Sequence, residues 1–334
     1  MFRYLQVAVC IVVLSAIASA QSTINGAGAT FPYPMYSKWF SEYNKQRPEV
    51  RINYQSIGSG GGIQQLLAGT VDFGATDGPM TDAQLEKAKG KILHVPTVLG
   101  SVVPAYNLPD VKQELKFTPQ ILADIFLGKI TSWNDKAIAS VNKDVTLPGQ
   151  PIVVVHRSDG SGTTYCFTDY LSKVSSEWKN SVGKGTSVKW PLGLGGKGNE
   201  GVAGVVRQMP GAIGYVELIY AVQNKIPYGS VRNSNGNFVK ASLEATSAAA
   251  ASASMPPDFR VSITNAPGND AYPISTFTWL LIPEQSRDPN KGKMIKEFLT
   301  WMLGPGQEMT KQLTYAPLPP PVVEKVRAAV QTVR

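Results

Sequence analysis

The stretch RSDGSGTTYCFTDYL, from Arg157 to Leu171, contains residue types that either hold an anion or attack a substrate. An arginine and an aspartate precede a glycine–serine–glycine–threonine turn, and the residues after this turn have the spacing of a helix. Small residues and hydroxyls at a helix start are typical of an anion-binding turn, because the first backbone N–H groups of a helix have no partner within it. A nucleophile site is the alternative, since Ser161, Cys166 and His156 are close in the sequence.

Two further turns share this design of a strand, a glycine- and hydroxyl-rich turn and a helix. They are GAGATF (26–31) and IGSGGG (57–62). Glycines let the backbone come close to a ligand, and a helix start is the positive end of a dipole. The hydroxyls beside the three helix starts belong to Thr30, Ser59, Ser161 and Thr163. Three such turns in one chain predict a single anion held by converging helix N-termini.

An exported hydrolase or phosphatase that uses Ser161 is the strongest alternative. The DGSGT sequence lacks the glycine two residues before the serine that a nucleophile elbow requires. His94 and His156 are the only histidines, and strand alternation places His156 on the face opposite to Arg157. Apolar and aromatic neighbours around Cys166 favour a buried, inert thiol. We therefore expect no catalytic residue and no enzymatic activity.

Other classes of function have weaker support. GLGGKG (193–198) resembles a nucleotide phosphate loop, but Lys197 is followed by Gly198 and the glycine spacing is wrong. The sequence has no HExxH, CxxC or carboxylate cluster, so we predict no metal site. A structural or adhesive surface protein would not need three glycine–hydroxyl turns. A thermal-shift panel of phosphate, sulfate and nitrate would separate an adhesin from a binding protein.

The first twenty residues have the three-part pattern of a secretory signal peptide. MFRYLQ carries one arginine, VAVCIVVLSAIA is apolar, and ASA ends with small residues, which predicts cleavage after Ala20. The apolar run is too short to span ~30 Å of hydrocarbon. Removal of this segment takes Cys10 away and leaves Cys166 as the only cysteine, so we expect no internal disulfide.

The length, the net charge and the hydrophobic pattern of the sequence limit the possible folds and partners. The chain has 334 residues, enough for two domains, and a net charge of +8, which becomes +7 without Arg3. Its lysines and arginines are dispersed, so nucleic acid is a weak prediction. Strand-like and helix-like runs alternate, which predicts α/β layers. The patterns predict a helix capped by Thr30, a surface helix over TDAQLEKAKG (81–90) and one amphipathic helix over KMIKEFLTWMLGPGQEMTKQL (293–313).

The sequence resembles the family of periplasmic phosphate-binding proteins of bacterial high-affinity phosphate ABC transporters. The matching stretches cover essentially the whole chain after the signal segment. They include GAGATFPYPMYSKW, VDFGATDGPM, RSDGSGTTYCFTDYL, VKWPLGLGGKGNEG and PGAIGYVE. The resemblance implies an α/β, two-lobed periplasmic binding protein of type II, each lobe a central mixed sheet flanked by helices. It places lobe 1 at residues 21–103 plus 272–334 and lobe 2 at residues 104–271, with the ligand between them.

The resemblance also implies the ligand and its contacts. Inorganic phosphate would be bound without a cofactor or metal and passed to a membrane permease in the periplasm by a protein that we expect to be a monomer. Asp159 would pair with the arginine and hold its guanidinium in place. The phosphate-binding residues carried over from the family are Ala29, Thr30, Phe31, Ser59, Asp77, Arg157, Ser161, Gly162 and Thr163.

Asp77 would make the site selective. A carboxylate facing an anion is repulsive unless the anion carries a proton to donate, and phosphate keeps at least one proton at neutral pH whereas sulfate does not. The mismatch with sulfate leaves a like charge and an unpaired buried acceptor, which allows discrimination of ~10⁴ or more. The alternative is that Asp77 is a turn residue that caps the following segment.

Overall fold

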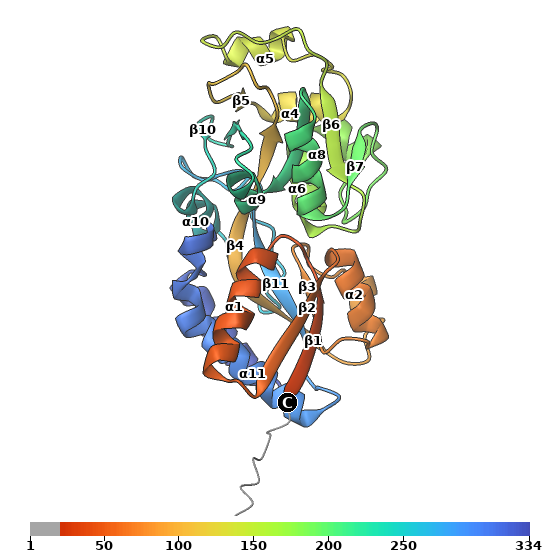
Figure 1. Cartoon of the computed structure of the whole chain (residues 1–334), viewed down its shortest axis with the longest axis vertical. Coiled ribbons are helices and arrows are strands. Elements are labelled where there is room, and N and C mark those ends of the chain that lie inside the picture. Colours follow the sequence, from red (N-terminus) through yellow and green to blue (C-terminus); the bar gives the residue numbers. More distant parts are fainter. Residues whose placement is uncertain (1–20) are drawn as a thin grey trace, which may run out of the picture.

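The computed structural model describes residues 21–334, so the predicted signal segment, residues 1–20, lies outside the described residues. The chain forms an elongated molecule with two parts along its long axis (Figure 1). We call the part formed mainly by the two ends of the chain the lower lobe, and the part formed by its middle the upper lobe, as they lie in Figure 1. Each contains strands covered by helices, which confirms the predicted fold class.

The lower lobe joins the first and last segments of the chain. Its elements from the N-terminal side are β1 (Ser22–Gly28), α1 (Tyr33–Gln46), β2 (Val50–Ser56), α2 (Ser59–Ala68), β3 (Phe73–Thr76) and α3 (Asp82–Leu85). Its elements from the C-terminal side are β11 (Ser275–Pro283), α11 (Pro289–Trp301), a π-helical turn (Met302–Gly306), a 3-10 turn (Thr310–Leu313) and α12 (Pro320–Val330). A bond from the Trp39 indole N–H to the Gly306 carbonyl at 2.7 Å ties the two ends together.

The upper lobe is continuous in sequence. Its strands are β5 (Lys116–Phe117), β6 (Val153–Arg157), β7 (Leu194–Gly196), β8 (Ala212–Glu217), β9 (Ser230–Arg232) and β10 (Phe238–Val239). Its helices are α4 (Pro119–Phe126), α5 (Lys136–Val141), α6 (Gly162–Val174), α7 (Ser176–Ser181), α8 (Gly198–Gln208) and α9 (Leu218–Gln223). We call the region where the two lobes meet the waist (Figure 1). At its side, α10 (Leu243–Ala251) packs on β11 and on the long strand β4 (Ile92–Tyr106).

One mixed sheet runs through both lobes, with strand order β2-β1-β3-β11-β4-β8-β6-β7. Strand β4 joins its two halves. Its residues from Ile92 to Ser101 pair antiparallel with β11, and Val102 to Tyr106 pair antiparallel with β8. Strand β3 pairs antiparallel with β11, whereas β1 pairs in parallel with β2 and β3, and β6 pairs in parallel with β7 and β8. The C-terminal ends of these parallel strands, and the turns that follow them, lie toward the waist. The lobe boundaries near residues 103 and 272 stay predictions.

Helix α1 shows how the sequence produces this packing. Its apolar residues recur every three or four positions, which places them on one face, and that face is buried against the sheet and α11. The buried residues are Met35, Tyr36, Trp39, Phe40 and Tyr43. Burying a side chain of this size contributes about 1.5–3 kcal/mol to folding, so this helix is held by its core face.

Three expectations about helices were wrong in detail. Pro32 precedes α1 and no side chain caps it, because the Thr30 hydroxyl bonds elsewhere. The surface helix predicted over residues 81–90 is only the single turn α3, held by a capping box between Thr81 and Gln84. The predicted C-terminal amphipathic helix is α11 followed by a π-helical turn, since Pro305 has no N–H to continue the helical bonds.

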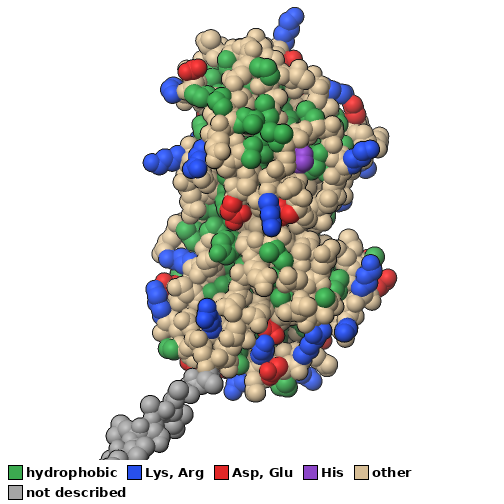
Figure 2. All heavy atoms as spheres, turned by 45° about the vertical axis from the view of Figure 1, so that its right-hand side comes forward, with side chains coloured by type: hydrophobic (Ala, Val, Ile, Leu, Met, Phe, Trp, Pro, Cys, Tyr) green, Lys and Arg blue, Asp and Glu red, His purple; other side chains and the backbone are tan. Residues whose placement is uncertain are grey.

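Basic and acidic side chains are scattered over both lobes on the face drawn in Figure 2, without a single basic stripe. This agrees with the dispersed charges of the sequence. In residues 21–334 no helix combines the length and the apolar character that crossing a bilayer requires.

Candidate anion-binding site

The turn between β1 and α1 contains two backbone amides, those of Thr30 and Phe31, that are not used in the sheet or the helix. The carbonyl of Thr30 accepts a bond from the Tyr220 hydroxyl at 2.5 Å, and the carbonyl of Phe31 accepts one from the Tyr315 hydroxyl at 2.6 Å. Because the N–H and C=O of a trans peptide point in opposite directions, the bond to Tyr220 turns the Phe31 N–H to the other side. Within residues 21–334, neither the Thr30 nor the Phe31 amide has a hydrogen-bond acceptor.

The amide of Ala29, another residue that the resemblance assigns to the site, is paired within the sheet. Its N–H donates to the Ala75 carbonyl at 3.0 Å, which extends the pairing of β1 with β3 by one residue. A strand amide that is already paired is not available to a ligand. The Ala29 amide is therefore engaged in the sheet here, and the contact of Ala29 with phosphate that the resemblance implies stays a prediction.

The turn before α2 touches the turn before α6 across the waist. The Gly60 N–H donates to the Gly160 carbonyl at 2.8 Å. Gly58 has φ 88°, and a side chain on it would come within 2.3 Å of the Asp159 carboxylate, so only glycine fits here. Ser59, fully buried, accepts bonds from the Asp77 amide at 3.2 Å and from the Gly162 amide at 3.0 Å.

Asp77 follows β3 and is 1% exposed. Its Oδ1 accepts a bond from the Thr278 hydroxyl at 2.9 Å. Burial raises the pKa of Asp77 to about 7, although the Thr278 bond, the positive charge of Arg157 and the Ser59 hydroxyl act in the opposite direction. This carboxyl is therefore one that readily shares a proton near neutral pH.

Arg157 ends β6 and is held in a fixed orientation. Its Nε and Nη2 donate to the two carboxylate oxygens of Asp159 at 2.8 and 2.5 Å, and its Nη1 donates to the Thr163 hydroxyl at 3.3 Å. Burial acts to raise the pKa of Asp159, but the bonds from Arg157 and from the Gly198 amide outweigh it and hold that pKa below its ordinary value. The predicted pairing of Asp159 with Arg157 is present, and it fixes the guanidinium plane.

Helix α6 begins among Ser59, Asp77 and Arg157, and we call these residues and the turns that carry them the cluster at the waist. Ser161 caps it, with its Oγ accepting from the Thr164 amide at 3.0 Å. The Gly162 amide donates to Ser59 and is engaged in this arrangement. A Cβ on Gly162 would lie 2.6 Å from the Asp77 carboxylate, so the helix start and this carboxyl are in direct contact. Thr163 is fully buried.

Sequence reasoning missed Asn199, the second residue of α8. Its side chain is completely buried, and its Nδ2 donates to the Thr30 hydroxyl at 2.8 Å and to the Thr163 hydroxyl at 3.0 Å. It thus connects the first turn with the third. Asn199 lies in VKWPLGLGGKGNEG, one of the stretches on which the family resemblance rests, and this position could have drawn attention to it. The local sequence around Asn199 gives no sign that it contacts Thr30.

The assembled cluster is rich in donors and has little net charge. Its one cation, Arg157, is paired with Asp159, while hydroxyls and helix-start amides supply the remaining polarity. Preorganised N–H and O–H dipoles in a site shielded from water stabilise an oxyanion without needing further cations. The predicted residues that meet at the waist are Thr30, Phe31, Ser59, Asp77, Arg157, Asp159, Ser161, Gly162 and Thr163.

The groups of the nucleophile alternative do not meet. His156 stacks on Trp190, with ring centroids 4.9 Å apart, and its Nδ1 lies 3.0 Å from the Arg157 carbonyl. Cys166 is 1% exposed, and burial raises its pKa well above the ordinary value. Residues 21–334 contain no group of three or more His, Cys, Asp or Glu side chains that could hold a metal ion.

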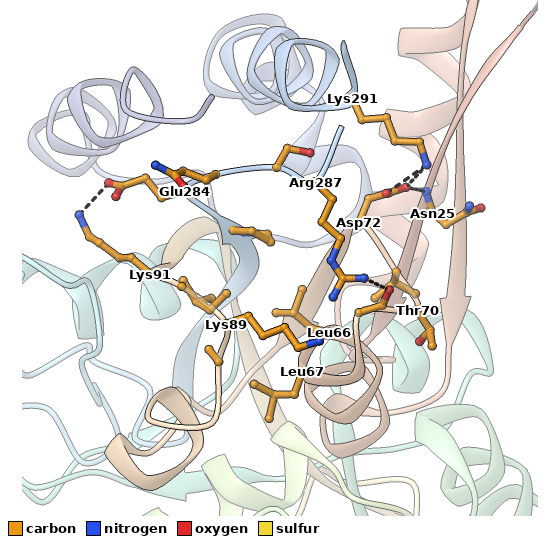
Figure 3. Close-up of a pocket in the computed structure, with 18 residues that line it drawn as sticks. Asn25, Leu66, Leu67, Thr70, Asp72, Lys89, Lys91, Glu284, Arg287 and Lys291 are labelled. Carbon is orange, nitrogen blue, oxygen red and sulfur yellow. Dashed lines mark hydrogen bonds and ion pairs between the residues drawn. The ribbon is translucent and has the colours of Figure 1, made fainter. Parts of the chain in front are cut away.

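A separate cavity of about 690 Å³ lies in the lower lobe between α2 and the start of α11 (Figure 3). Its charged side chains are largely paired with one another. Lys91 binds Glu284 at 2.8 Å, Lys291 binds Asp72 at 2.9 Å, and Arg287 donates to the Gly69 carbonyl. None of the predicted site residues lines it. It is distinct from the cluster at the waist.

A model of the PBP superfamily domain matches residues 15–305 of the chain. Among curated relatives, the phosphate-binding protein PstS of Xylella fastidiosa (strain Temecula1) is 49% identical over 317 residues, which cover 94% of this chain and 86% of that protein. The phosphate-binding protein PstS of Haemophilus influenzae is 46% identical over 326 residues, covering 96% of this chain and 97% of that protein.

Solved structures agree on the fold. A phosphate-binding protein from Stenotrophomonas maltophilia superposes with a TM-score of 0.72 at 19% identity, covering 92% of this chain and 93% of that one. A phosphate ABC transporter substrate-binding protein from Clostridium perfringens, solved with bound phosphate, gives a TM-score of 0.66 at 19% identity, covering 89% and 100%.

Proposed function

This chain belongs to the PBP superfamily and, within it, to the PstS phosphate-binding proteins, and on that basis we propose that it binds inorganic phosphate at the waist and delivers it to an ABC-type importer. Binding is reversible and involves no covalent step. The lobes close on the anion and open to release it to the membrane permease. The proposed place of action is the periplasm, reached after cleavage of residues 1–20, and the proposed active form is a monomer that binds no nucleic acid.

The observation that carries the proposal is a buried carboxyl among donors. Asp77 is 1% exposed and has a pKa of about 7, and around it lie Arg157, the start of α6 and several hydroxyls. A ligand that satisfies this set must accept many hydrogen bonds and also offer one proton. Phosphate at neutral pH does both.

Each residue of the proposed site has a stated part. Arg157 offers its planar guanidinium to the anion, and Asp159 holds that plane. Thr30, Phe31 and Thr163 offer free amides or hydroxyl protons, Ser59 and Ser161 offer hydroxyl protons, and Gly162 allows close approach. Asp77 accepts a charge-assisted hydrogen bond from the proton that phosphate carries. The Ala29 amide is paired with β3 in the sheet, so we assign it no hydrogen bond to the anion in this arrangement.

Calorimetry on protein freed of carried-over ligand tests the proposal. We expect one phosphate per chain and little heat from sulfate or nitrate. Saturating phosphate at about 100 times its dissociation constant should add about 2.7 kcal/mol of stability, which raises the melting temperature by roughly 5–10 °C. Absence of phosphate binding, or hydrolysis of a chromogenic phosphate ester, would overturn it.

A further inference from the structure

Among residues 21–334, Asn199 is the one side chain of the waist that bonds hydroxyls from both lobes at once. It lies on α8 of the upper lobe, and it contacts Thr30 of the lower lobe and Thr163 of the upper lobe. We propose that Asn199 is a positioning residue that aims these two hydroxyl protons at the bound anion and holds the lobes together around it. The inference rests on the proposed function and adds a residue to it.

The orientation of the Asn199 amide is fixed by the backbone. Its Oδ1 accepts a bond from the Glu217 N–H at 2.9 Å, at the end of β8. A flipped amide would place its NH₂ group against that N–H, so two donors would face each other in a fully buried position. The Nδ2 group must therefore face the two threonines.

This orientation decides what the threonine hydroxyls can do. A hydroxyl has one proton and two lone pairs. The Thr30 Oγ1 accepts from the Asn199 amide N–H at 3.2 Å and from Nδ2 at 2.8 Å. The Thr163 Oγ1 accepts from Nδ2 at 3.0 Å and from Arg157 at 3.3 Å. With their lone pairs used, both hydroxyls are left with a proton to donate, and the acceptor is an oxygen of the anion.

The same bonds link closure to affinity. Thr30 and Asn199 are 169 residues apart and lie on different lobes, so their bonds form when the lobes come together. An interaction made only after closure slows release and leaves the encounter step unchanged. Loss of Asn199 should therefore raise the dissociation rate of phosphate while the association rate stays near its original value.

Stopped-flow and calorimetric titrations with inorganic phosphate test this on the mature chain. We expect Asn199→Ala to raise the dissociation rate about tenfold or more, with the association rate changed less than twofold. Asn199→Asp should bind still more weakly, because its carboxylate accepts the two hydroxyl protons that the anion needs. The aspartate variant keeps the side-chain shape and the bond from Glu217, so it serves where the alanine variant does not fold.

Two controls separate this role from a merely structural one. Asn142 is buried in the upper lobe and makes three bonds to Lys116 and Ile138, so Asn142→Ala should leave both rates unchanged. Thr30→Val removes the hydroxyl that Asn199 aims. The double variant Asn199→Ala/Thr30→Val should therefore lose much less affinity than the product of the single losses.

The outcomes are distinguishable from failure of the proposed function. If the unmodified protein does not bind phosphate, the proposed function fails. If it binds phosphate but Asn199→Asp retains the original dissociation rate, or the two single losses multiply, the positioning role of Asn199 is overturned.

Discussion

Replacing Asp77 by asparagine removes the group that separates phosphate from sulfate in this account. In the structure, burial moves the pKa of Asp77 from its ordinary 3.8 to about 7. A difference of about three in pKa corresponds to about 4 kcal/mol, at about 1.4 kcal/mol for each unit. That free energy is the cost of keeping Asp77 ionised in this buried position, compared with a carboxyl in water. Phosphate offsets it by donating a proton, and sulfate has none to donate.

The Asp77→Asn variant should therefore bind sulfate up to about 10³-fold more tightly at pH 8, since the amide stays neutral and donates a bond. Phosphate should lose about tenfold at most, because one charge-assisted bond is exchanged for a neutral one. The pKa of Asp77 is raised, so the cost is absent below about pH 4, grows from pH 4 to 7 and is constant above. Sulfate binding by the unmodified protein should weaken over that range, and the variant should show no such trend.

Calorimetric titration of the unmodified protein and the Asp77→Asn variant with phosphate and with sulfate, at pH 5 and pH 8, measures these affinities. Asp72→Asn is the matched control, since Asp72 pairs with Lys291 at the cavity of Figure 3, away from the waist. It should leave both affinities unchanged. Equal rejection of sulfate by the Asp77→Asn variant and the unmodified protein would refute the role of the carboxyl.

Two further predictions concern the same cluster, and a third concerns the buried thiol of Cys166. Gly162→Ala should lower phosphate affinity at least ~100-fold in calorimetry, because a methyl group would lie 2.6 Å from Asp77, whereas Gly204→Ala, with open space around it, should bind normally. Arg157→Lys should weaken binding by ~10-fold or more while keeping the charge, since lysine lacks the planar fork; unchanged affinity would contradict a bidentate contact. Cys166 should resist a thiol reagent in the native protein and react on unfolding, and equal rates in both states would show that it is exposed.

Much of the site could be predicted from the sequence because its parts are local. Each turn can be identified from six or seven consecutive residues, because glycines and hydroxyls stand directly before a helix. The pairing of Arg157 with Asp159 spans only two residues and was anticipated. The burial of Cys166 followed from its apolar neighbours.

What the sequence could not provide depends on long-range contacts. Asn199 acquires its role from Thr30, 169 residues away, so no local pattern relates them. Ala29 lies in a turn of the anion-binding type, but its amide donates to the Ala75 carbonyl of β3. Thr30 resembles a helix cap, but its hydroxyl is held by the other lobe. In each case, tertiary hydrogen bonding overrides a correct local preference.

A crystal structure of the mature chain grown with phosphate tests the central claim most directly. The account predicts one phosphate at the waist, with an oxygen within hydrogen-bond distance of the Asp77 carboxylate and other oxygens contacting Arg157 and Thr30. Phosphate bound only among the lysines of the lower-lobe cavity, with Asp77 remote from it, would contradict the account.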